Sequence, residues 1–97
     1  MKAKILVIED ELPIVELLKY NLSKASYDVD YCLDGESALD KIFSSVKYDL
    51  ILIDWMLPEL SGIEISRRIR KSKSTKNVPL IMLTARGEEE DKLKEYF

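Results

Sequence analysis

Short, continuous runs of apolar residues recur along the chain, and three of them stop abruptly at a polar side chain. The runs are Ile5–Ile8, Leu50–Ile53 and Leu80–Leu83. Runs of four residues rich in Ile and Leu are typical of strands buried on both faces, as in a parallel sheet. A half-polar run at Asp28–Cys32, in which polar and apolar residues alternate, predicts a fourth strand at a sheet edge.

Between these strands, apolar positions recur at the spacing of amphipathic helices. Pro13 suits a first helical position, and the apolar face of the helix that follows is expected to contain Ile14, Leu17, Leu18, Leu22 and Ala25. The predicted helices run from Pro13 to about Lys24, from Gly35 to Phe43, from Ile63 to about Lys71 and from Glu88 to Phe97. This alternation predicts right-handed crossovers and a single α/β domain with a doubly wound parallel sheet.

The residues that end the apolar runs carry oxygen donors. Glu9 and Asp10 follow the first run, Asp54 follows the central run, and Thr84 follows the last. Parallel strands place their carboxyl ends along one edge of the sheet, so we expect three carboxylates and a hydroxyl to converge there. Such donors suit a hard cation such as Mg²⁺, which takes few protein ligands and keeps several waters.

Composition narrows the possible chemistry. The 97 residues are 46% hydrophobic and 34% charged, with a net charge of −3, which fits one small globular domain and argues against a nucleic-acid surface. No apolar stretch is long enough to cross a membrane, and one cysteine, Cys32, fits a reducing, cytoplasmic location. The absence of histidine excludes Ser–His and Cys–His nucleophiles, and the three scattered glycines exclude a glycine-rich phosphate loop.

Four motifs, taken in order, resemble the receiver domain of bacterial response regulators of the OmpR/PhoB class. They are K-I-L-V-I-E-D-E at 4–11, L-I-L-I-D-W-M-L-P at 50–58, S-G-I-E at 61–64 and P-L-I-M-L-T-A-R at 79–86. The resemblance covers the whole chain in register. It implies a flavodoxin-like sheet with strand order 2-1-3-4, and a phosphoacceptor in a His-to-Asp relay supplied by a sensor histidine kinase.

The resemblance also implies a role for each site residue. An Asp carboxylate is a nucleophile toward phosphorus, and a bound Mg²⁺ offsets the repulsion between the two anions. The chain would then be no enzyme beyond its own, self-catalysed phosphorylation. Asp54 would be the phosphoacceptor and a metal ligand, and Asp10 would be the second carboxylate ligand. Glu9 would hold a metal-bound water, and the Met56 backbone carbonyl would be the third metal oxygen. The Thr84 hydroxyl and the Ala85 backbone N–H would each donate a hydrogen bond to a phosphoryl oxygen.

The chain also departs from the family pattern. The resemblance implies that a complete receiver continues with a fifth strand, a lysine that pairs with the phosphoryl group, and a fifth helix. On this interpretation residues 1–97 are a truncated receiver, with a DNA-binding output domain in a longer parent and no direct contact between this chain and DNA. The strand predicted at Leu80–Leu83 would then be uncovered and available for self-association.

Other interpretations stay open at this point. Without the lysine, the chain could be a Mg²⁺-binding fragment that cannot carry phosphate. A phosphohydrolase of the haloacid-dehalogenase type also uses a strand-end Asp, but it requires a second acid where Met56 stands. Acids at strand ends also serve as helix caps or solvated side chains, an alternative that applies to Glu9 and Asp10.

Overall fold

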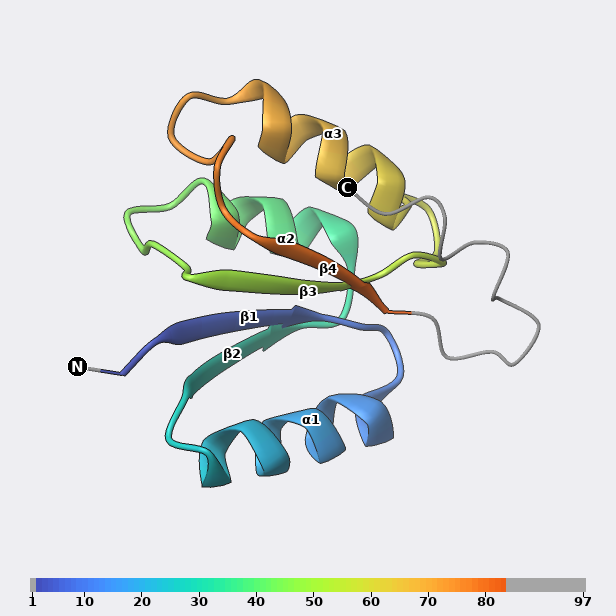
Figure 1. Cartoon of the computed structure of the whole chain (residues 1–97). Coiled ribbons are helices and arrows are strands. Elements are labelled where there is room, and N and C mark those ends of the chain that lie inside the picture. Colours follow the sequence, from blue (N-terminus) through green and yellow to red (C-terminus); the bar gives the residue numbers. More distant parts are fainter. Residues whose placement is uncertain (1, 84–97) are drawn as a thin grey trace.

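The computed structural model describes residues 2–83, which form four strands and three helices in strict alternation (Figure 1). Each of the first three strands precedes a helix, as the apolar runs predict. The predicted fourth helix at Glu88–Phe97 lies outside the described residues. The elements are β1 Lys4–Ile8, α1 Leu12–Lys24, β2 Asp28–Cys32, α2 Gly35–Ile42, β3 Leu50–Asp54, α3 Gly62–Lys71 and β4 Leu80–Leu83.

The four strands form one parallel sheet in the order β2-β1-β3-β4, which confirms the predicted order. The chain reverses its direction of winding between β2 and β3, so β1 and β3 lie side by side at the centre. Helix α1 covers one face of the sheet, and α2 and α3 cover the other (Figure 1). A doubly wound sheet of this kind has its ligand crevice at the carboxyl ends of the strands beside the reversal point.

Two apolar clusters, one on each face, hold these layers together. Alternate residues of β1 point to opposite faces, so Ile5 and Val7 join the α1 cluster while Leu6 and Ile8 join the cluster under α2 and α3. All four side chains are at most 2% exposed. The sequence therefore shows a continuous apolar run where a one-sided sheet would show alternation.

The apolar face predicted for α1 is partly wrong. Val15, at 1% exposed, is the buried residue of this helix, and Leu18 and Leu22 pack beside it. Leu17 is 61% exposed and Ala25 forms the C-cap, so neither contributes to that face. Val15, Leu18 and Leu22 are spaced at i, i+3 and i+7 and so lie on one side of the helix. Leu17 lies on a second apolar stripe that overlaps the first in the sequence. Phe43, expected on α2, is the exposed C-cap of that helix.

Side-chain caps set the starts of α2 and α3. The Asp34 carboxylate accepts a hydrogen bond from the Ser37 backbone N–H at 2.7 Å, and the Ser61 hydroxyl accepts one from the Glu64 N–H at 3.2 Å. These bonds satisfy backbone donors that the first helical turn leaves without partners. Within the described residues, no helix is long and apolar enough to cross a membrane.

Candidate metal centre

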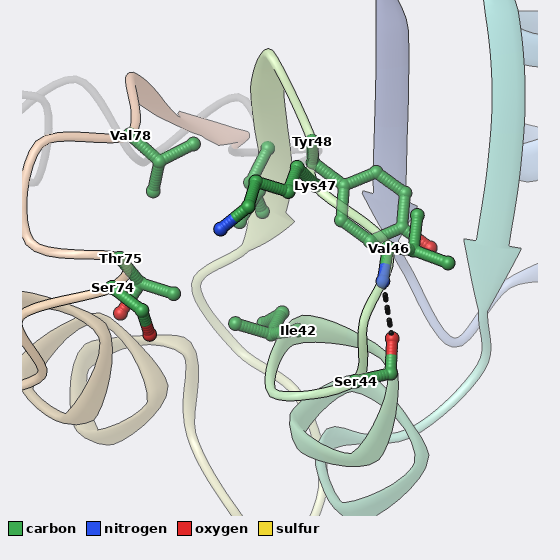
Figure 2. Close-up of a pocket in the computed structure, with 9 residues that line it drawn as sticks. Ile42, Ser44, Val46, Lys47, Tyr48, Ser74, Thr75 and Val78 are labelled. Atoms are coloured by element: carbon green, nitrogen blue, oxygen red, sulfur yellow. Dashed lines mark hydrogen bonds between the residues drawn. The ribbon is translucent and has the colours of Figure 1, made fainter.

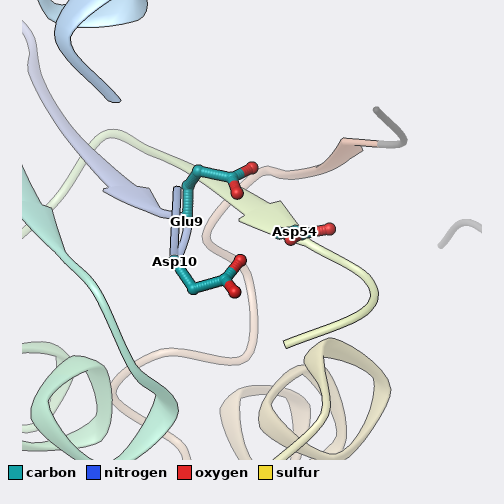
Figure 3. A group of neighbouring side chains, drawn as sticks. All are labelled: Glu9, Asp10 and Asp54. Carbon is teal, nitrogen blue, oxygen red and sulfur yellow. The ribbon is translucent and has the colours of Figure 1, made fainter. Parts of the chain in front are cut away.

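Three carboxylates meet at the carboxyl ends of the two central strands. Glu9 and Asp10 follow β1 directly, and Asp54 is the last residue of β3. The two strands pair in parallel with Ile8 opposite Ile53, so the residues that follow lie next to each other. Carboxylate oxygens of Glu9, Asp10 and Asp54 all lie within 4.8 Å of one another (Figure 3).

Burial makes this cluster electrostatically costly without a counterion. Glu9 is 1% exposed and Asp54 is 2% exposed, whereas Asp10 lies at the solvent surface. Burial raises the pKa of Glu9 to about 7, and the negative charges of Asp54 and Asp10 add to this effect. Burial also raises the pKa of Asp54, again with a contribution from Asp10. A cation placed between these carboxylates would stabilise their charged forms.

Backbone N–H groups hold the two buried side chains in place. The Glu11 N–H donates to Glu9 Oε2 at 3.1 Å, and the Met56 N–H donates to Asp54 Oδ1 at 3.1 Å. Each of these bonds links residues two positions apart, so the turn that follows the strand orients the carboxylate that ends it. The alternative in which Glu9 is a solvated surface acid is wrong, because its side chain is buried.

No basic side chain of residues 2–83 neutralises this cluster. The ion pairs in the described part of the chain join Lys4 to Asp28 and Asp30, and Glu64 to Arg67 and Arg68. Two buried carboxylates and one exposed carboxylate form an all-oxygen donor set, which fits Mg²⁺ or another hard divalent cation. The exposed Asp10 leaves a path for water ligands.

The structure brings together the predicted carboxylates, and Met56 follows Asp54 by two residues in the adjoining turn. Thr84 and Ala85 lie outside the described residues, so their expected roles stay predictions. Cys32 is 4% exposed, as a small buried side chain, and burial raises the pKa of its thiol to about 11. Such a thiol is protonated at neutral pH and unsuited to nucleophilic chemistry.

One residue at this site has no counterpart in the sequence-based prediction. Gly62 starts α3 directly against the end of β3, where a Cβ atom on Gly62 would lie only 2.4 Å from the Asp54 backbone oxygen. The serine–glycine pair before an apolar helix was a visible signal of a cap. The approach to Asp54, however, depends on how the helix packs on the strand.

A cavity of about 100 Å³ lies at the opposite end of the sheet from the acidic cluster (Figure 2). It lies between the end of α2, the start of β3 and the segment that leads into β4, and Figure 2 shows Ile42, Tyr48 and Val78 around it. Its lining is apolar and hydroxyl-bearing, with Lys47 as the charged member and no carboxylate. This cavity therefore lacks the donor set of the acidic cluster.

The basic segment at the end of α3 is engaged in contacts within the fold. Arg68 pairs with Glu64 at 3.2 Å, and Arg70 donates to the backbone oxygens of Lys76 and Val78 at 2.8 and 2.6 Å. Two arginines of this segment are therefore engaged by groups of the fold itself.

The fold and the acidic cluster define a class, that of doubly wound parallel α/β proteins with a cluster of carboxylates at the strand ends. Comparison with known protein families assigns the chain to one of them. The sequence model of the family described as the response regulator receiver domain matches residues 5–96, so the chain belongs to this family. Receiver domains are signalling modules of two-component systems, phosphorylated by sensor histidine kinases, and are not classical enzymes. This result leaves no support for the haloacid-dehalogenase alternative.

Two proteins similar to this chain are the transcriptional regulatory proteins PhoB and PhoP. The chain is 45% identical over 94 residues to the phosphate regulon transcriptional regulatory protein PhoB of Rhizobium meliloti, covering 97% of this chain and 41% of that protein. It is 50% identical over 93 residues to the alkaline phosphatase synthesis transcriptional regulatory protein PhoP of Bacillus subtilis, covering 96% of this chain and 38% of that protein. The chain therefore spans about two fifths of the length of these relatives.

Solved structures agree on the fold. The response regulator TrrA of Thermotoga maritima, in complex with Mg²⁺ and BeF, superposes with a TM-score of 0.83 at 42% identity and covers 98% of this chain and 79% of that chain. The chemotaxis response regulator CheY4 of Vibrio cholerae gives a TM-score of 0.86 at 30% identity, with coverages of 95% and 76%. The flavodoxin-like sheet predicted from the sequence is confirmed for the described strands.

Proposed function

We propose that residues 1–97 form one receiver domain that accepts a phosphoryl group on Asp54 with the help of Mg²⁺. The observation that carries the proposal is the meeting of Glu9, Asp10 and Asp54, two of them buried, at the carboxyl edge of the sheet. In this proposal Asp10, Asp54 and the Met56 backbone carbonyl hold the cation directly, and Glu9 holds it through a water. The TrrA relative was crystallised with Mg²⁺ and BeF, which supports the same ion here.

Asp54 supplies the nucleophile. One oxygen of its carboxylate is oriented by the Met56 N–H at 3.1 Å, and the carboxylate attacks the phosphorus of the donor. A P–O bond to Asp54 forms as the bond from phosphorus to the donor's leaving group breaks, and the leaving group departs with the electron pair. Bound Mg²⁺ supplies positive charge that stabilises the phosphoryl oxygens and the approaching carboxylate. Asp10 binds the cation directly and Glu9 binds it through a water, so both keep its positive charge at the site.

Two further donors complete the proposed site from outside the described residues. The Thr84 hydroxyl and the Ala85 backbone N–H would each bind a phosphoryl oxygen. Thr84 directly follows β4, which pairs with β3 so that Leu83 lies opposite Asp54. This register supports the assignment of Thr84 to the same edge of the sheet.

The partner and setting follow from the family. We propose a sensor histidine kinase as phosphodonor and, by analogy with the PhoB and PhoP relatives, a parent protein that regulates transcription in the cytoplasm. DNA binding would belong to another domain of such a parent. The receiver would report phosphorylation to it and contribute no DNA contact of its own.

The test is intact mass measurement after incubation with Mg²⁺ and a small phosphodonor such as acetyl phosphate. Phosphorylation adds roughly 80 Da, the mass of one phosphoryl group replacing a proton. We expect this gain in the wild-type chain and its loss in Asp54→Asn, whereas Asp49→Asn, at the opposite end of β3, retains it. The absence of any gain together with intact Mg²⁺ binding would instead support the fragment that binds metal but carries no phosphate.

Self-association through β4 is a further part of the proposal. Among the described strands β4 pairs only with β3, and its Ile81 side chain is 49% exposed. Edge strands with exposed apolar residues pair readily with other chains. Sedimentation should show a concentration-dependent dimer that Ile81→Lys weakens. A monomer at all concentrations would contradict this part alone.

A further inference from the structure

The loop that joins β3 to α3 returns to the strand it leaves. It starts after Asp54, and the Gly62 N–H at the beginning of α3 donates to the Trp55 backbone oxygen at 3.2 Å. The loop contains the Met56 peptide, whose N–H orients the Asp54 carboxylate. It also contains Leu57, which is buried, and Glu59 in the left-handed region at φ 65°. The path of the loop is therefore closely defined next to the phosphoacceptor.

Gly62 makes the closest approach in this arrangement. A Cβ atom at this position would lie 2.4 Å from the Asp54 backbone oxygen, 3.0 Å from Trp55 Cα and 3.2 Å from the Asp54 carbonyl carbon. All three are backbone atoms, so no rotation of a side chain can relieve the contact. The φ of Gly62 is not positive, so the requirement for glycine comes from space and not from backbone conformation.

The peptide that Gly62 touches also connects the metal site to the sheet. Its carbonyl belongs to Asp54 and its N–H belongs to Trp55, which donates to the Leu83 oxygen on β4 at 3.3 Å. A group pressing on the carbonyl would rotate this peptide and loosen the bond to β4. The same rotation would move the Met56 N–H away from Asp54 Oδ1, since Met56 is the next residue but one.

We propose that Gly62 is a positioning residue for the acidic site. Its missing side chain lets α3 lie against the Asp54–Trp55 peptide and keeps the Asp54 carboxylate and the Met56 carbonyl aimed at the cation. Within α3, the buried Ser66 hydroxyl donates to the Gly62 oxygen at 2.8 Å, a bond that stabilises the first turn of the helix. This inference rests on the proposed metal site and adds the element that sets its geometry.

The chain offers a matched control in Gly35, the first residue of α2. A Cβ atom there would meet the Ile65 Cδ1 atom at 2.9 Å and Leu60 Cβ and the Leu60 oxygen at 3.0 Å. None of these atoms belongs to the Asp54–Trp55 peptide, and the nearest is the flexible end of a side chain. Gly35→Ala is thus the same chemical change at the same helix position, without a direct contact to the Asp54–Trp55 peptide.

The experiment measures Mg²⁺ affinity by calorimetry and by the fluorescence of Trp55, the single tryptophan of the chain, which adjoins Asp54. We expect Gly62→Ala to weaken Mg²⁺ binding by about 10–100-fold, as changes to residues supporting a metal ligand do. Gly35→Ala should lower the unfolding midpoint and leave Mg²⁺ affinity unchanged. Each titration is repeated in trimethylamine N-oxide, an osmolyte that favours the folded state.

The outcomes separate this inference from the proposed function. A wild-type chain that does not bind Mg²⁺ would overturn the metal site itself. Wild-type affinity in folded Gly62→Ala, or an equal loss in Gly35→Ala, would overturn the positioning role while the metal site stands. A Gly62→Ala chain that stays unfolded in the osmolyte would make Gly62 a requirement for folding only, which also overturns the positioning role.

Discussion

The two ends of the parallel sheet use carboxylates in opposite ways. At the carboxyl end, Glu9 and Asp54 are buried beside Asp10, and no basic residue of the described chain pairs with them. At the amino end, Lys4 binds Asp28 at 2.8 Å, and Asp30 accepts a hydrogen bond from the Tyr48 hydroxyl at 2.8 Å. The pKa of Asp28 is lowered by Lys4, whereas burial raises the pKa values of Glu9 and Asp54.

This difference identifies which end is built for a ligand. At the amino end, Lys4 and the Tyr48 hydroxyl already partner the carboxylates of Asp28 and Asp30. The carboxylates at the carboxyl end have no basic partner among residues 2–83, so they cost folding free energy when they are charged, and a bound cation would recover that cost. Groups with strongly shifted pKa values in one cluster are a mark of a functional site, and here geometry and burial point to the same place.

The largest effect should come from Mg²⁺ itself. At about 100 times its dissociation constant, Mg²⁺ should raise the free energy of unfolding by about 2.7 kcal/mol. Asp10→Asn should remove most of this gain, and Asp28→Asn at the amino end should retain it. Thermal unfolding with and without Mg²⁺ measures the difference. Equal gains in the two variants would break the comparison between the ends of the sheet.

The second effect is the pH dependence of the metal-free chain. The pKa of Glu9 rises from 4.5 to about 7 on folding, so between these values the folded state binds more protons than the unfolded state. Stability from this group is therefore greatest at low pH, falls as pH rises from about 4.5 to 7, and is level above that. Urea unfolding across this range should show the decline.

Glu9→Gln provides the control for this prediction, because its amide does not titrate. The variant should show a flatter pH profile between about 4.5 and 7 than the wild type. A Glu9→Gln profile that parallels the wild type would show that Glu9 titrates normally in the folded chain.

A smaller effect is expected from Tyr48→Phe at the amino end. The substitution removes the hydroxyl that donates to Asp30, which should cost about 1 kcal/mol of stability. Mg²⁺ affinity should not change, since Tyr48 lies at the opposite end of β3. Urea unfolding and calorimetry on the same samples check both parts. A weaker Mg²⁺ affinity would show that the two ends are coupled through the strand.

The smallest effect should come from Asp28→Asn, which breaks an exposed ion pair with Lys4. Because the pKa of Asp28 is lowered on folding, its contribution is present above its ordinary pKa of 3.8 and is lost as pH falls below that value. The variant should thus be slightly less stable than wild type at pH 7 and equal to it in strong acid. A difference that grows toward low pH would contradict the pairing.

Much of the fold could be predicted from local pattern because its strands are buried on both faces. The runs that end at Ile8 and Ile53 are continuous, and each is followed by a helical pattern, so the alternation of elements was readable. The candidate site followed from one rule about parallel strands, which places Asp10 and Asp54 at the same edge. The sheet-facing side of α1 was harder to predict, because Val15 and Leu17 lie on overlapping apolar stripes. Only the packing of the helix on the sheet decides which stripe is buried.

The sequence by itself determined which residues end the strands, the order of helices and strands, and the acidic donors available to a cation. These properties depend on residue type and periodicity along a short stretch of chain. Only the tertiary structure decided that Glu9 is buried, that Lys4 pairs with Asp28, and that Gly62 lies against the Asp54 peptide. The Lys4–Asp28 pair depends on the register of β1 against β2, and the burial of Glu9 and the position of Gly62 depend on how strands and helices pack.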